Sequence, residues 1–111
     1  MFQHSKIGAI DVISGSMPLD AKNIDTAEAT CALCFEKGQP RIVFNLEGIA
    51  LIDSKGLEFM LQLRDQCQHR GGTIHLAAPN PLCCDILQAT GLAEQFTLFD
   101  DVNSAVGSFS Q

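Results

Sequence analysis

Residues 41–46 form a nearly continuous apolar run with the sequence Arg-Ile-Val-Phe-Asn-Leu. A strand whose apolar side chains point to both faces is typical of parallel or mixed sheets that are covered by helices on both faces. The run therefore predicts a buried strand in a layered fold.

Strand and helix patterns alternate along the rest of the chain. The expected strands cover residues 7–13, 41–46, 73–77 and 96–99, and a further strand at residues 2–5 is an open alternative. The expected helices cover residues 24–37, 56–70, 81–90 and about 101–109, with Gly38, Gly71 and Gly91 as stop signals. This alternation predicts one α/β domain over residues 1–111, in which helices pack on a sheet.

Two of these helices have a predicted buried side. In the longest one, the apolar stripe consists of Gly56, Met60, Leu63 and Cys67. The opposite, solvated stripe consists of Glu58, Gln62, Asp65 and His69. In the helix that Asn80 and Pro81 open, the predicted apolar side consists of Leu82, Ile86 and Leu87.

Composition excludes several classes of function. Asp and Glu outnumber Lys and Arg by 13 to 7, for a net charge of −6, which argues against binding to a nucleic-acid backbone. No apolar run approaches the ~18 residues of a membrane span, and the first residues do not form a secretion signal. We therefore expect a cytoplasmic protein with no membrane insertion, whose five cysteines are reduced thiols.

The segment Asp53-Ser54-Lys55-Gly56 lies where an apolar run ends and the longest helix begins. The first N–H groups of a helix lack internal partners and carry a partial positive charge, so a phosphate on Ser54 would be favourably placed there. Lys55 adds a nearby cation, and Gly56 leaves the approach open because it has no side chain. The competing interpretation is that Ser54 or Asp53 only caps the helix, which is the commonest role of these residue types at this position.

Five segments of the chain resemble STAS domains. Residues 41–57 resemble the central segment of this family, in which an apolar strand and a short connection lead into Asp-Ser-x-Gly-Leu. Residues 70–76, 87–92 and 96–105 resemble later segments in the same order, and residues 19–21 fit the loop after the early strand. The resemblance covers nearly the whole chain. It implies a mixed sheet of four to five strands with about four helices packed mainly on one face.

Within this family the chain resembles anti-sigma factor antagonists, which implies a regulatory protein rather than an enzyme, with no cofactor. The resemblance implies that Ser54 is phosphorylated and that the unmodified form binds an anti-sigma factor, often the serine kinase itself, while a phosphatase resets the switch. The partner-binding residues it implies are Asp20, Asp53, Ser54, Lys55, Gly56 and Glu58. The alternative is a STAS subunit of a larger assembly, such as a lipid-transport ATPase complex, that is not phosphorylated.

Three residues depart from the family pattern. Asn45 stands where the strand often ends in Asp, Lys55 replaces a small or hydroxylic residue, and Glu58 replaces a small residue. Lys55 and Glu58 leave the identity of the partner open, and the sequence leaves the oligomeric state open.

The cysteines and histidines do not form a motif of their own. Cys31 and Cys34 are spaced as a C-x-x-C but fall in the middle of a predicted helix, which favours core packing over redox chemistry. The adjacent Cys83 and Cys84 do not match zinc-site spacing, so no metal site is predicted. A hydrolase that uses Ser54 would need a histidine base, and His75 is the open candidate.

Overall fold

A five-stranded sheet with the strand order β1-β2-β3-β4-β5 forms the centre of the computed structural model, which describes residues 1–36 and 38–109. The strands are β1 (Phe2–Ile7), β2 (Ile10–Gly15), β3 (Arg41–Asn45), β4 (Thr73–Ala77) and β5 (Thr97–Phe99). The helices are α1 (Ile24–Ala32), α2 (Ser54–His69), α3 (Pro81–Ala89) and α4 (Val102–Ser108), with short 3-10 turns η1 (Leu33–Phe35) and η2 (Leu92–Glu94). None of the helices among the described residues is both long and apolar enough to cross a membrane.

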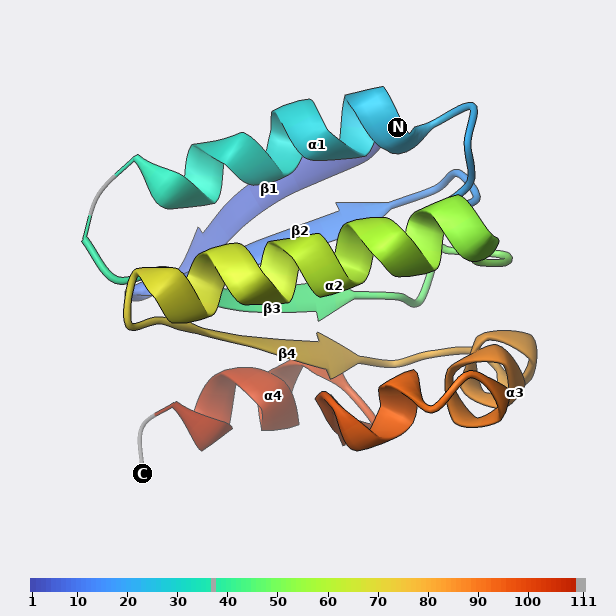
Figure 1. Ribbon diagram of the computed structural model, residues 1–111. Helices are drawn as coiled ribbons and strands as arrows, with labels where there is room; N and C mark the ends of the chain where they lie inside the picture. Colours follow the sequence, from blue (N-terminus) through green and yellow to red (C-terminus); the bar gives the residue numbers. More distant parts are fainter. Residues whose placement is uncertain (37, 110–111) are drawn as a thin grey trace.

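The sheet is mixed, as predicted. Strand β1 pairs with β2 in the antiparallel direction, whereas β2, β3, β4 and β5 are mutually parallel. Each parallel connection runs through a helix, because the chain has to return to the same end of the sheet before it starts the next strand. Figure 1 shows these connections, with α1 and α2 lying side by side over the strands.

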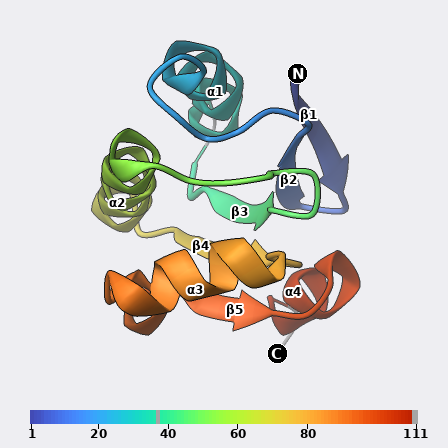
Figure 2. The ribbon, with the colours of Figure 1, turned by 90° about the vertical axis from the view of Figure 1, so that its right-hand side faces the viewer.

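The two faces of the sheet are covered unequally. Ile42 and Phe44 of β3 are buried on the face that α1, α2 and α3 cover, whereas Val43 between them packs in a second cluster with Ala105 of α4. Figure 2 shows α1 and α2 on one side of the sheet and α4 on the other. The apolar run at residues 41–46 is therefore explained by burial on both faces, and three of the four helices do lie on one face.

The prediction of a single strand over residues 7–13 is wrong. The chain forms a tight β-hairpin there, in which Ile7 pairs with Ile10 and the turn between them contains Gly8 at a φ of +61°. A left-handed φ favours glycine, so Gly8 breaks the apolar run that suggested one strand. The alternative of an additional N-terminal strand is confirmed, because β1 spans Phe2–Ile7.

Two helix predictions need correction. The helix expected at residues 24–37 ends at Ala32 and continues as η1 to Phe35, and residue 37 lies outside the described residues. In α3, Leu82 is 51% exposed, and the buried positions are Cys83 and Leu87. These two residues are four positions apart, so they share the face that meets the core, and Leu82 points away from it. The stripes predicted for α2 are confirmed.

The packing of α4 on the sheet includes a histidine. The ring of His75 stacks on Phe109, with centroids 4.7 Å apart, and its Nδ1 lies 3.0 Å from the Ser108 hydroxyl, which donates to the Ala105 carbonyl. Burial lowers the pKa of His75 below its ordinary value, because the charged imidazolium loses hydration there.

We expect the stability that depends on this contact to be lost as the pH falls. Because the folded state holds the pKa of His75 below its unfolded value, the unfolded chain binds the proton more readily, and stability rises with pH up to the unfolded pKa. Urea unfolding at about pH 5.5 and about pH 7.5, on either side of the ordinary histidine pKa of about 6.5, measures the effect. The variant His75→Gln should reduce this pH dependence, and His69→Gln, at an exposed position of α2, should not. Equal pH dependence in wild type and His75→Gln would contradict the expectation.

Candidate functional site

Ser54 is the first residue of α2, and its side chain is exposed. The preceding residue, Asp53, is the N-cap: it has an extended backbone, and its Oδ1 accepts a hydrogen bond of 2.9 Å from the Gly56 N–H. In the part of the chain that the structure describes, no hydrogen bond involves the Ser54 hydroxyl. The helix is thus capped by Asp53 rather than by Ser54, and the exposed serine hydroxyl does not take part in the cap.

The Asp53 carboxylate also joins two loops. Its second oxygen, Oδ2, accepts a hydrogen bond of 3.1 Å from the N–H of Ala21, in the loop between β2 and α1. The N–H of Asp53 donates to the Leu19 carbonyl at 3.2 Å, and the N–H of Leu19 donates to the Leu51 carbonyl at 3.0 Å. The segment before α2 and the segment before α1 are therefore held against each other beside Ser54.

Hydrogen bonding keeps Asp53 ionised. The Gly56 N–H, followed by that of Ala21, lowers the pKa of this carboxyl below its ordinary value, because both donors favour the charged form. The site therefore carries a permanent negative charge next to the Ser54 hydroxyl at neutral pH.

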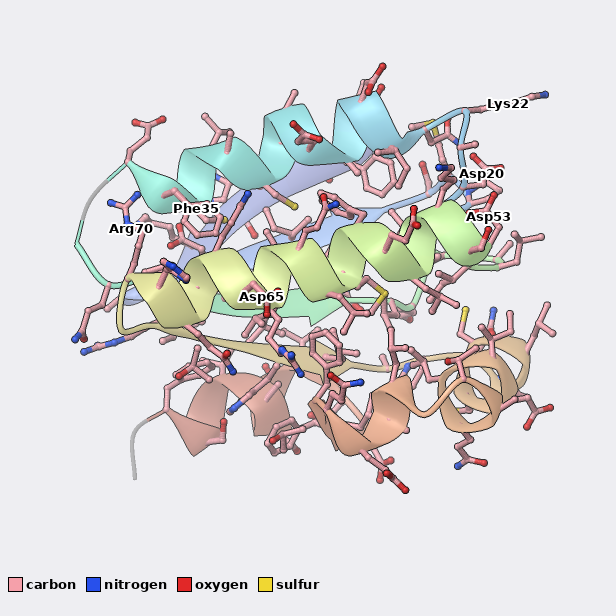
Figure 3. The ribbon with its side chains drawn as sticks, viewed as in Figure 1. Asp20, Lys22, Phe35, Asp53, Asp65 and Arg70 are labelled. Carbon is pink, nitrogen blue, oxygen red and sulfur yellow. The ribbon has the colours of Figure 1, made fainter. Side chains whose placement is uncertain are left out.

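Asp20 lies at the same end of the molecule as Asp53, as Figure 3 shows. Its Oδ1 accepts hydrogen bonds from the N–H groups of Lys22 and Asn23 and from the Asn23 side-chain amide, at 3.0–3.2 Å. These bonds fix the turn that enters α1, so Asp20 shapes its own loop. The structure brings Asp20 and Asp53 to one end of the molecule.

Lys55 and Glu58 lie on the exposed surface of α2. The Lys55 ammonium is 3.6 Å from the Glu58 carboxylate, and both side chains are about two-thirds exposed. An exposed pair of this kind is weak and exchanges readily for other partners. Both residues also line a small pocket of about 240 Å³ between the starts of α1 and α2, together with Ala21, Ile24, Asp25, Phe59 and Gln62.

The reason offered for Gly56 needs correction. The sequence suggested that this glycine leaves the approach to Ser54 open, but Gly56 is buried. A Cβ atom at this position would lie 2.1 Å from the Leu19 carbonyl oxygen. The missing side chain therefore makes room for the neighbouring loop, and Gly56 offers a partner no side-chain contact of its own.

Sequence reasoning missed Asn80 as part of this end of the molecule beyond its capping role. Its Oδ1 accepts from the Cys83 N–H at 2.7 Å, and its Nδ2 donates to the carbonyls of Ile49 and Ala50 at 3.1 and 3.2 Å. Asn80 thus connects α3 to the segment that precedes Ser54. An Asn before a proline predicts a cap, but nothing in the sequence indicates which loop its amide group reaches.

A serine-based hydrolytic site is not assembled around Ser54. His75 is engaged with Ser108 and stacks on Phe109, on the face of the sheet that α4 covers. His69 is the last residue of α2, at the opposite end of the helix that Ser54 begins. His4 pairs with Asp11 in the N-terminal hairpin.

Cys31 and Cys34 are core residues rather than a redox pair. Cys31, Cys34 and Cys67 are buried in the main hydrophobic cluster. Burial raises the pKa of the Cys34 and Cys67 thiols to about 12 and raises that of Cys31 further. Reactive cysteines have thiol pKa values below the ordinary one, so these thiols lack the electrostatics of a C-x-x-C redox site.

Comparison with known proteins identifies the family of the chain. Residues 3–105 match the STAS domain family. A search of curated proteins finds no match.

Solved structures resemble the whole chain. An anti-sigma factor antagonist from Mycobacterium paratuberculosis is 18% identical with a TM-score of 0.88, over 100% of this chain and 94% of that one. The anti-sigma factor antagonist SpoIIAA in its unphosphorylated form is 20% identical with a TM-score of 0.81, over 99% and 96% of the two chains. Its phosphorylated form, from Bacillus, is 20% identical with a TM-score of 0.73, over 98% and 99%.

A domain of a much larger protein also has this fold. The murine Solute Carrier 26 anion transporter in its inward-facing state is 16% identical with a TM-score of 0.79, over 92% of this chain and 18% of that one. At these identities the likeness establishes the fold, and the arrangement around Ser54 has to be interpreted from its own geometry.

Proposed function

The chain belongs to the STAS domain family, and from this premise we propose that it is a partner-switching regulatory protein whose binding is turned off by phosphorylation of Ser54. The unmodified form binds an anti-sigma factor or serine kinase, and a phosphatase restores that form. The function is binding rather than catalysis. The kinase needs ATP, so the cytoplasm is the compartment we propose.

The observation that supports the proposal most directly is the free Ser54 hydroxyl. Asp53 performs the capping, so phosphorylation of Ser54 would break no hydrogen bond of the described structure. A kinase can reach an exposed side chain at the beginning of a helix, and the folded domain survives the modification. Ser54 is therefore suited to carry a reversible signal on an otherwise unchanged fold.

Charge supplies the switching mechanism. A phosphoserine adds roughly −1.5 to −2 charges near neutral pH. This charge would lie beside the ionised Asp53, and the exposed Lys55 ammonium already pairs with Glu58. A partner surface that accommodates a neutral hydroxyl next to one carboxylate would then face a strongly anionic group. Repulsion and lost hydration reduce affinity without a change in the fold.

The surface that we propose for the partner surrounds this serine. Asp20 and Asp53 present charged groups at the same end of the molecule. Lys55 and Glu58 add two more on the first turns of α2. The buried Gly56 sets the distance between α2 and the loop that contains Leu19, which we call the Leu19 loop. The two solved forms of SpoIIAA, unphosphorylated and phosphorylated, are of an anti-sigma factor antagonist with this fold, which supports a partner of the anti-sigma class.

A second candidate is a STAS subunit that holds a larger assembly together without being phosphorylated, for example beside a lipid-transport ATPase. The likeness to a domain inside an anion transporter favours it, because the same fold serves there as part of a larger protein. Ser54 would then contribute only an unmodified hydroxyl to a permanent interface.

Mass spectrometry of the protein recovered from its own cells separates the two candidates. The switch predicts a fraction of chains that carry one phosphate, located on the peptide containing Ser54, together with an unmodified fraction that co-purifies with a kinase or anti-sigma factor. The absence of phosphate under several growth conditions, with tight co-purification of an ATPase, would contradict the switch and favour the permanent subunit.

A further inference from the structure

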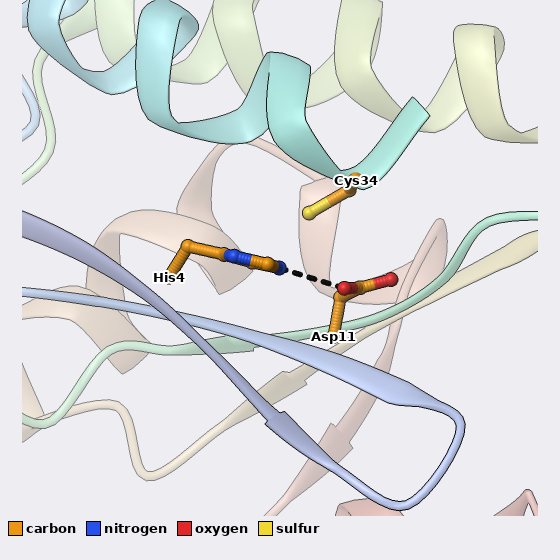
Figure 4. Close-up of side chains that lie close together, drawn as sticks. All are labelled: His4, Asp11 and Cys34. Carbon is orange, nitrogen blue, oxygen red and sulfur yellow. Dashed lines mark hydrogen bonds and ion pairs between the residues drawn. The ribbon is translucent and has the colours of Figure 1, made fainter. Parts of the chain in front are cut away.

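A cluster of three potential metal ligands lies at the end of the sheet away from Ser54. His4 from β1, Asp11 from β2 and Cys34 from η1 converge there, as Figure 4 shows. Their ligand atoms all lie within 4.8 Å of one another, and His4 Nε2 is 2.7 Å from Asp11 Oδ1. Asp11 begins the parallel pairing of β2 with β3, whereas Ser54 follows the carboxyl end of β3, so the two sites are at opposite ends of the strands.

The hairpin turn creates this juxtaposition. Asp11 pairs with Lys6 in the β1–β2 ladder, and His4 is two residues before Lys6. Residues that face each other in an antiparallel ladder share a face of the sheet, as do residues two apart in one strand. His4 and Asp11 are therefore diagonal neighbours beneath η1, which supplies the third side chain.

We propose that His4, Asp11 and Cys34 bind a zinc ion or another divalent metal of similar softness. Imidazole nitrogen, carboxylate oxygen and thiolate sulfur are the three ligand types that zinc takes in proteins, and three protein ligands leave the fourth tetrahedral position to water. The ion replaces the hydrogen bond between His4 and Asp11 with two bonds to the metal. This inference does not depend on Ser54 or on the proposed switch.

The surroundings of the cluster suit a metal ion. Asp11 is the only buried charged residue among those that the structure describes, and its side chain is 10% exposed. A buried carboxylate is costly unless it is paired or coordinates a metal. The His4 side chain is 21% exposed. The Lys6 ammonium lies 3.7 Å from Asp11, and its side chain is 61% exposed. An ion can therefore reach the cluster from this side when Lys6 turns toward solvent.

Metal binding has to deprotonate the thiol. Burial, followed by the charges of Asp11 and Cys67, raises the pKa of Cys34 to about 12, with Lys6 opposing them, so the metal-free protein holds this thiol protonated. On binding, the S–H bond breaks, an S–metal bond forms and one proton leaves to solvent. The proton that His4 Nε2 shares with Asp11 also has to leave Nε2 before this nitrogen can bind the metal, and it passes to Nδ1 by exchange with solvent.

Titration of the reduced, metal-free protein, residues 1–111, with Co²⁺ and then Zn²⁺ tests the proposal. We expect one Co²⁺ per chain, a thiolate-to-cobalt charge-transfer absorption band, release of one proton, and loss of the band when Zn²⁺ displaces Co²⁺. The wild-type spectrum alone decides whether a thiolate takes part, so the result does not depend on how the variants fold. Absence of the thiolate band would overturn the proposal.

Matched variants locate the ligands. His4→Gln and Cys34→Ser should each reduce affinity about a hundredfold or more, because losing a group that merely orients a ligand already costs roughly ten- to a hundredfold. His69→Gln and Cys84→Ser change the same residue types outside the cluster and should bind as wild type does. Equal affinity in wild type and Cys34→Ser would also overturn the proposal.

Discussion

Phosphorylation of Ser54 is expected to weaken partner binding about a hundredfold. Repulsion and lost hydration of about 3 kcal/mol at the interface suffice, because each 1.4 kcal/mol changes the dissociation constant about tenfold. The variant Ser54→Asp adds one negative charge instead of roughly two, so its affinity should fall less, by about tenfold. Ser54→Ala removes only a hydroxyl that has no hydrogen-bond partner in the described structure, and it should bind as the unmodified protein does and resist control by the kinase.

The measurement is the dissociation constant of each form for the partner captured from the native cells. Ser5→Asp is the matched control, because it adds the same charge at an exposed serine of β1, away from α2. Salt dependence adds a second readout, since a purely electrostatic loss of affinity shrinks as the ionic strength rises. If Ser54→Asp and Ser54→Ala both bind like wild type, the switch is wrong.

Replacing Gly56 with alanine is expected to destabilise the whole site although Ser54 stays in place. The added Cβ atom would lie 2.1 Å from the Leu19 carbonyl oxygen and 2.9 Å from Ile52 Cγ2. The carbonyl belongs to the backbone and cannot rotate away like a side chain, so the Leu19 loop has to move away from α2. Its hydrogen bonds with Asp53 and Leu51, and that between Asp53 and Ala21, weaken together.

The sign of this effect follows from two opposing contributions. Alanine favours a helix over glycine by about 1 kcal/mol. Overpacking typically costs about 1–3 kcal/mol and occasionally more. A clash of the new Cβ atom with a backbone carbonyl lies at the upper end of this range, because the carbonyl cannot rotate away. We expect a net loss of about 2 kcal/mol, which lowers Tm by roughly 8–16 °C in a domain of about this size.

Thermal unfolding of Gly56→Ala beside Gly107→Ala checks this expectation. Gly107 is also a helical glycine, in α4, but nothing lies within 4 Å of its added Cβ, so Gly107→Ala should be neutral or slightly stabilising. Partner binding by Gly56→Ala should weaken as well, because the loop carrying Asp20 shifts. A Tm for Gly56→Ala equal to that of wild type would contradict the close packing.

Local signals in the sequence predicted much of this fold. The strand at residues 73–77 and the cap at Asn80 are where the sequence indicates them. For the last helix the sequence leaves Asp100 and Asp101 as alternative caps, and the structure has Asp101. The apolar stripe of α2 also matches, because a sixteen-residue amphipathic helix repeats its pattern several times. The hairpin at Gly8 was missed because its turn is only two residues long and lies inside an apolar run.

The sequence also predicts only part of the candidate site. The sequence places Ser54 at the beginning of a helix, but it does not show that Asp53 rather than Ser54 is the cap. That choice depends on which side chain reaches the Gly56 N–H, and so on the backbone conformation at residue 53. The burial of Gly56 and the meeting of His4 with Cys34 depend on segments far apart in the chain, which no local pattern encodes.

The order of the strands in space is also their order along the chain. During synthesis, β1 and β2 emerge from the ribosome before the other strands of this sheet, and they pair with each other through a two-residue turn. Every later strand then adds at an edge that already exists, and no strand has to be inserted between two others. Folding can therefore follow translation, with few distant segments to be matched at the end. Among the elements of this domain, α4 emerges last and covers the face of the sheet that has been open until then. A chain truncated before α4 would therefore expose Val12, Val43 and Ala77.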